Sequence, residues 1–417
     1  MLIALESYGG SYLGICTMLN QVADDLEENQ SFVPVAKTVD ALKHAESAYL
    51  LLHAIPSDLL ASIIRGTVAY DFLRGGRKPH QYSKKTGGTY VAAVSISGRD
   101  GKFLSGKELG TLASLIEDYI EAYDDFVNNG FRWDENSGDS QTRKRFIASV
   151  DGVYGKTEPD ASPRFVRKPA HRQSTKALAE MFRRREKAAR DPDEQHIQSP
   201  LMVGCNGASK KLIKDRVAAH YPKNGLTATT HTWAITLCLL GHMGRKPIVT
   251  TVAVLPTWER NDLPLSERLV TALAQSLVTQ DGFNVDQPGK HPDGHSHSSL
   301  ITSRQMVMGS RSWFRDALDA SIKHIARERE DAKVVGLLKE KGPKRGILTL
   351  LERRTRMRVD LQRLYVRVAQ DEEKLEEQIL EARHKQTELR ETEEMVGNLA
   401  RSLEEICLTI KSRNANE

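Results

Sequence analysis

The chain has no long hydrophobic run and few cysteines. No stretch approaches the roughly 18 consecutive apolar residues that a membrane-spanning helix needs. The N-terminus lacks a basic segment and carries Glu6 early, so we expect no secretory signal. The cysteines Cys16, Cys205, Cys238 and Cys407 are scattered without metal-ligand spacing, which indicates reduced thiols inside the cell. These absences disfavour a membrane protein and a disulfide-stapled secreted domain.

Strong charge of one sign is also missing. The net charge of +5 is too small to establish a nucleic-acid partner, so its distribution along the chain carries more information than its sum. The chain consists of 39% hydrophobic and 28% charged residues, which indicates a sizeable core beside strongly solvated parts. A length of 417 residues favours two or three domains.

The residue patterns divide the chain into four parts. Residues 1–145 are predicted to be a mainly helical N-terminal region, and 146–290 an α/β (α+β) domain with a basic insertion at 156–200. Residues 291–346 are predicted to be a linker with a short helix, and 347–412 a long coiled-coil helix. The fold class is therefore a small three-stranded sheet with flanking helices, between a helical region and a coiled coil.

Strand candidates are short and rich in β-branched residues. We assign the three strands of the sheet to 146–155, 200–205 and 246–256, and find a further strand candidate at 89–97 in the N-terminal region. The segment after Ser105 predicts a helix, because Glu108 completes a capping box.

The C-terminal part carries a seven-residue apolar repeat. Its members are Leu361, Val368, Leu375, Ala382, Leu389, Val396, Leu403 and Ile410. A sustained repeat of this length is typical of a helix that pairs with a second helix, so we expect a homo-oligomer or a partner helix. The alternative is a single amphipathic helix packed on its own domain.

In the middle part a set of motifs follows one order along the chain. The motifs are Gly152-Val153-Tyr154, Leu201-Met202-Val203-Gly204, Arg216, His220, Glu267 and Asn284. This order resembles the GIY-YIG nuclease family, whose two strand motifs are followed by a helix with Arg and His, then by a Glu and a terminal Asn. The resemblance covers roughly a third of the chain.

The resemblance implies metal-dependent hydrolysis of a phosphodiester in DNA or RNA. Glu267 would hold one Mg²⁺ ion, a hard cation suited to carboxylate ligands. Arg216 would clamp a phosphate oxygen, and His220, one helical turn later, would orient water or contact phosphate. Tyr154 would act as the base or proton relay.

Two further residues would support that site. Gly204 ends the second strand, and Asn284 would tie the exit of the last helix to the sheet by hydrogen bonds. Met202 stands where the family has its second tyrosine. The alternative is therefore a non-catalytic scaffold with a degenerate nuclease fold, which dimerises through its coiled coil.

Each catalytic candidate also has an ordinary interpretation. Arg216 can pair with Asp215 at the surface, which contributes little stability. His220 can interact with the C-terminus of its helix, and Glu267 is a carboxylate favoured by the first turn of a helix.

Basic residues gather in the predicted insertion. They are Arg164, Arg167, Lys168, His171, Arg172, Arg183, Arg184, Arg185 and Lys187. Such a run can neutralise nucleic-acid phosphates or act as a nuclear import signal, with the last four residues as the predicted nucleic-acid contacts. A solvated helical face is the alternative.

Overall fold

The computed structural model describes residues 12–28, 32–44, 46–74, 87–155, 162–206, 217–226, 229–259, 262–289, 297–309 and 311–338. Residues 1–354 form one compact unit and 355–417 a second. Arg216 and the predicted coiled coil at 347–412 lie outside the described residues.

The described elements are three strands and the helices that precede, separate and follow them. Before the first strand come α2 (Leu13–Glu28), α3 (Ala36–His44), α4 (Glu46–His53), α5 (Ser57–Arg65) and α6 (Val68–Arg74). Next follow β1 (Gly88–Ile96), α7 (Gly106–Asn128), α8 (Gly138–Asp151), α9 (Pro169–Ala188) and β2 (Leu201–Asn206). The last are η1 (Pro222–Asn224), α11 (His231–His242), β3 (Pro247–Pro256), α12 (Asp262–Ala274), α13 (His297–Gly309) and α14 (Arg311–Leu338).

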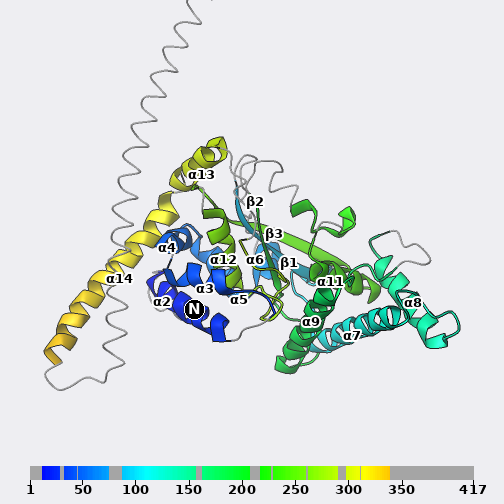
Figure 1. Ribbon diagram of the computed structural model, residues 1–417. Helices are drawn as coiled ribbons and strands as arrows, with labels where there is room; N and C mark the ends of the chain where they lie inside the picture. The colour runs from blue at the N-terminus through cyan, green and yellow to red at the C-terminus, as the bar shows by residue number, and fades with distance from the viewer. Residues whose placement is uncertain are drawn as a thin grey trace, which may run out of the picture. The chain divides into compact units, whose positions relative to one another are not determined.

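The sheet is antiparallel and has the order β2-β1-β3, with helices around it (Figure 1). The small three-stranded sheet with flanking helices is therefore confirmed. Its central strand β1 is buried along its whole length, because it pairs on both edges and is covered on both faces. In the register, Val91 of β1 lies opposite Val203 of β2.

Successive side chains of the strands point to opposite faces of the sheet. On one face Thr89 contacts α12, where its Oγ1 lies 2.5 Å from Oγ of Ser266. On the other face Met202 contacts the start of α11, since Oγ1 of Thr230 lies 3.6 Å from its Sδ. Helices α12 and α11 therefore lie on opposite faces of the sheet.

The predicted strand at 146–155 is wrong, because this segment belongs to helix α8 up to Asp151. Ser137 caps the helix by accepting a hydrogen bond from the Ser140 N–H. Ile147, Val150 and Asp151 are buried at three- and four-residue spacing, which is a helical face. The third strand is instead β1, from the region predicted to be mainly helical, so the sheet combines strands from both sides of residue 145.

Helices α7 and α9 lie side by side beside the sheet (Figure 1). The start of α7 has the predicted capping box, in which Ser105 and Glu108 each bond the other's backbone N–H. Within the described ranges, no helix is long and apolar enough to cross a membrane.

Candidate functional site

His220 is buried against the face of the sheet that α11 covers. Its Nε2 lies 2.7 Å from Oη of Tyr90, and its Nδ1 lies 2.8 Å from Oγ1 of Thr229. Gly204 lies opposite Tyr90, and a Cβ there would stand 2.5 Å from the Tyr90 hydroxyl. Because Gly204 has no side chain, the Tyr90 hydroxyl has room to reach His220. Both ring nitrogens of His220 are hydrogen-bonded to side chains of this protein.

Glu267 lies on the other face of the sheet, in α12. Its Oε2 accepts hydrogen bonds from the Gly289 N–H at 2.7 Å and from Sγ of Cys205 at 3.2 Å. A Mg²⁺ ion takes oxygen ligands, whereas these contacts are an N–H and a thiol. The described surroundings of Glu267 do not fit a magnesium site, and we derive no step through a metal.

Tyr154 follows the end of α8 and packs against α11. A Cβ at Gly241 of α11 would lie 3.2 Å from the Tyr154 hydroxyl, and burial raises the pKa of Tyr154. The described candidates Tyr154, His220 and Glu267 thus occupy different places, with His220 and Glu267 on opposite faces of the sheet. Across the described ranges, no group of three or more His, Cys, Asp or Glu side chains could hold a metal ion.

Asn284 makes the contact with the sheet that the sequence predicted. Its Oδ1 accepts from the Val203 N–H at 2.9 Å, and its Nδ2 donates to the Val203 carbonyl at 2.8 Å. The neighbouring Phe283 N–H donates to the Leu201 carbonyl at 3.1 Å. The segment at 283–284 therefore covers the outer edge of β2.

The arginines in the second half of α9 tie this helix to its neighbours. Arg183 forms an ion pair with Glu117 of α7 at 2.7 Å, and Arg185 pairs with Asp281 at 2.9 Å. Arg184 donates to the Gln280 carbonyl at 2.6 Å, while Lys187 is exposed. The three predicted phosphate-binding arginines are thus engaged with other parts of this chain.

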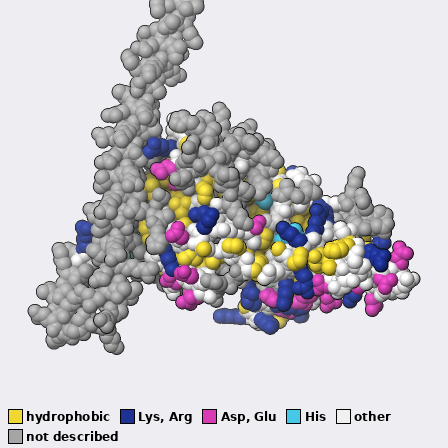
Figure 2. Space-filling model, viewed as in Figure 1, with side chains coloured by type: hydrophobic (Ala, Val, Ile, Leu, Met, Phe, Trp, Pro, Cys, Tyr) yellow, Lys and Arg dark blue, Asp and Glu magenta, His cyan; other side chains and the backbone are white. Residues whose placement is uncertain are grey.

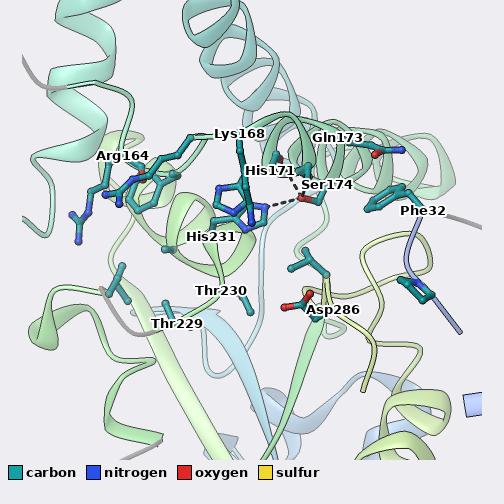
Figure 3. A pocket seen from close by; sticks show the side chains of 17 residues that line it. Phe32, Arg164, Lys168, His171, Gln173, Ser174, Thr229, Thr230, His231 and Asp286 are labelled. Carbon is teal, nitrogen blue, oxygen red and sulfur yellow. Dashed lines mark hydrogen bonds between the residues drawn. The ribbon is translucent and has the colours of Figure 1, made fainter. Parts of the chain in front are cut away.

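A cavity of about 730 Å³ lies where α9 and α11 begin (Figure 3). Arg164, Arg167 and Lys168 contribute three cationic side chains to its lining. Among the lining residues that the structure describes, Asp286 is the one carboxylate. Figure 2 shows histidine side chains on this face of the molecule, beside Lys and Arg side chains. The lining therefore has an excess of positive charge, which favours an anionic ligand.

Two stacked histidines lie in this cavity. The rings of His171 and His231 are 4.3 Å apart between centroids and nearly parallel, at 16°. Nε2 of His231 lies 2.7 Å from Oγ of Ser174, which itself donates to the Ala170 carbonyl at 2.9 Å. We therefore assign the proton of His231 to Nε2, since the Ser174 hydroxyl has one hydrogen.

Burial disfavours the protonated form of both histidines. Burial and the neighbouring His171 lower the pKa of His231 to about 3. Burial and the nearby Lys168 lower the pKa of His171 as well. A neutral His171 can donate an N–H to an anion without adding a charge that must be buried, whereas the one N–H of His231 is already donated to Ser174.

The helix starts add to the positive character of the cavity. Helix α9 begins after Lys168 and α11 after Thr230, and neither has a side-chain cap or an acidic residue in its first turn. The positive ends of both helix dipoles are therefore not neutralised by a carboxylate of their own. Arg164 fixes the loop before α9, because its backbone N–H donates to the buried Asp151 carboxylate at 2.9 Å.

Sequence reasoning singled out the basic residues of this cavity but gave no role to His231. The His171–His231 contact joins the starts of two helices that are distant in sequence, so no local spacing reports it. The usable signal was the basic run immediately before a helix that begins with proline.

No protein family matches the chain, and comparisons with curated proteins and solved structures likewise found no match.

Proposed function

We propose that this protein binds nucleic acid, with the cavity at the starts of α9 and α11 as its phosphate site. The observation that carries the proposal is the basic lining: Arg164, Arg167 and Lys168 line the same cavity as the stacked pair His171 and His231. Phosphate oxygens are bound in proteins by Arg and Lys side chains and by helix N-termini, and the cavity offers both kinds of group.

Binding accounts for the geometry better than cleavage does. A nuclease of the GIY-YIG kind needs its metal ligand and its phosphate contacts in one cleft. Glu267 bonds Cys205 on one face of the sheet, whereas His220 bonds Tyr90 on the other. We therefore favour nucleic-acid binding without hydrolysis, which shares with the scaffold alternative only the loss of catalysis. Incubating labelled DNA and RNA with Mg²⁺ or Mn²⁺ tests this choice, and cleavage that Glu267→Ala abolishes would restore the nuclease.

We further propose that the C-terminal repeat makes the protein a homodimer. The apolar register from Leu361 to Ile410 supports this. A dimer would carry two phosphate sites, which raises the avidity for a ligand that reaches both. We place the protein inside the cell, which the buried thiols of Cys16, Cys205 and Cys238 support. The nucleus is the proposed compartment, because the basic run at 164–187 can act as an import signal.

The test is a charge-removal experiment with a matched control. The cavity variant, Arg167→Gln with Lys168→Gln, removes two exposed cations from the lining of the cavity. The control variant, Lys187→Gln with Arg190→Gln, removes two exposed cations at and just after the C-terminal end of α9. Fluorescence polarisation with single-stranded and duplex DNA and RNA gives the affinity at several salt concentrations.

The cavity variant should bind more weakly, because each cation that touches a phosphate releases a counterion on binding. Removing one such cation should therefore reduce the slope of log affinity against log salt by about 1. The control should match the wild type. An equal fall in affinity in both variants would show a general charge effect and no site. Absence of binding at low salt would reject the proposed function.

A further inference from the structure

The cations of α9 do not form a continuous track. Arg172 is held by Asp124 through two hydrogen bonds of 2.6 and 2.7 Å. Further along α9, Arg183 pairs with the carboxylate of Glu117. Arg185 pairs with the carboxylate of Asp281. A strand lying along a protein needs a groove of cations that follows its backbone. In the part of the chain that the structure describes, the cations of this region without a carboxylate partner form two separate groups. Arg167 and Lys168 lie at the cavity, whereas Lys187 and Arg190 lie at and just after the other end of α9.

The cavity itself has two unlike ends (Figure 3). At one end Lys168 lies above the stacked His171 and His231 rings, and Arg164 lies further out on that side. At the other end lies Phe32, which is 37% exposed although it lines the cavity. A flat, accessible aromatic ring is a surface on which a nucleobase can stack.

The volume of the cavity suits a small ligand. At about 730 Å³ it lies in the range of pockets that enclose a small organic molecule. In the described lining, three cations stand against one carboxylate, Asp286, and this excess favours a ligand with more than one negative charge. A terminal phosphate monoester carries close to two charges at neutral pH, whereas a phosphodiester within a strand carries one.

We propose that this cavity takes one nucleotide bearing a terminal phosphate, so that the protein binds the end of a nucleic-acid strand and not its interior. The phosphate lies at the His171–His231 end, near Lys168, and the base stacks on Phe32. This inference rests on the proposed function and names its ligand. The same chemistry could come from a free nucleoside monophosphate, and the experiment separates the two sources.

The experiment compares oligonucleotides of one sequence in DNA and in RNA with the full-length protein. The strands end in a 5′-phosphate, a 3′-phosphate or hydroxyls only, and a fourth form is circular. A free nucleoside monophosphate serves as competitor. We expect a linear strand with a terminal phosphate to bind at least tenfold more tightly than the hydroxyl-ended or circular form.

Two variants assign the ends of the cavity. Phe32→Ala should weaken binding about tenfold and leave the preference for a terminal phosphate. Lys168→Gln should reduce that preference. Phe131→Ala is the matched control, because Phe131 is 67% exposed and lies outside the cavity lining. Unchanged melting temperatures will show that the variants fold.

Failure of this inference can be told apart from failure of the proposed function. Circular strands that bind as tightly as phosphorylated linear ones overturn strand-end recognition and leave nucleic-acid binding intact. Binding of the free monophosphate alone overturns nucleic-acid binding and retains the nucleotide chemistry of the cavity. If neither strands nor nucleotide bind, both proposals are wrong.

Discussion

Asn284 offers a quantitative test of how the sheet is held. Its side-chain amide makes two hydrogen bonds with the backbone of Val203, a residue that is 3% exposed. In Asn284→Ala both backbone groups of Val203 lose their partner. A buried polar group left unpaired costs about 1–3 kcal/mol, so the free energy of unfolding should fall by about 2–4 kcal/mol, allowing for partial rescue by water.

Urea denaturation followed by circular dichroism measures this change, and the melting temperature should fall by roughly 4 to 8 °C. Asn284→Asp keeps an acceptor for the Val203 N–H but has no donor for the carbonyl, so its loss should be about half as large. Asn136→Ala, at an exposed loop position, is the control. A loss below about 0.5 kcal/mol in Asn284→Ala would show that the strand edge is held by other contacts and refute the reasoning.

Three further predictions concern a buried acid, an ion pair and assembly. Burial raises the pKa of Asp262 from 3.8 to about 7, so the folded protein keeps this proton where the unfolded chain has lost it. The free energy of unfolding should therefore fall as the pH rises from 3.8 to about 7, and Asp262→Asn should flatten that slope in urea denaturation. An identical slope in both proteins would contradict this assignment. Arg185→Gln breaks an ion pair whose carboxylate, Asp281, is 45% exposed, and should cost about 1 kcal/mol, without changing nucleic-acid affinity in polarisation assays. A drop in affinity would mean that Arg185 contacts the ligand. Deleting the residues after Gly346 should reduce the mass in light scattering to that of a monomer, and an unchanged mass would reject the C-terminal repeat as the assembly element.

Local sequence patterns identified most elements of the fold but not how they pair. The segments at 89–97, 200–205 and 246–256 were recognised as strands from their β-branched and apolar residues, and α7 from its capping box. The segment at 146–155 failed because Ile147 and Val150 are also compatible with a buried helical face. That β1 is the central strand depends on contacts with segments far away in the sequence, which no local pattern reports.

The candidate site shows the same limit. Asn284 and the basic residues around Lys168 could be selected from the sequence, because the hydrogen-bonding capacity or charge of each follows from its residue type alone. The sequence interpretation placed His220 and Glu267 in one cleft, because the order of the motifs along this chain resembles their order in the GIY-YIG family. Their actual positions depend on which face of the sheet each helix covers, and that is decided by the packing of the whole core.

The central place of β1 has a consequence for how the protein is made. Translation proceeds from the N-terminus, so β1 leaves the ribosome before either of its neighbours has been synthesised. The sheet cannot close until Pro256, the last residue of β3, has emerged. At ordinary rates of synthesis this leaves the nine residues of β1 without strand partners for on the order of ten seconds. A nascent chain that stops before β2 would expose a strand with two open edges, and one that stops between β2 and β3 would still leave one edge of β1 open as a template for aggregation. Production of the protein should therefore depend on chaperones that hold the segment from β1 to β2 until the third strand arrives.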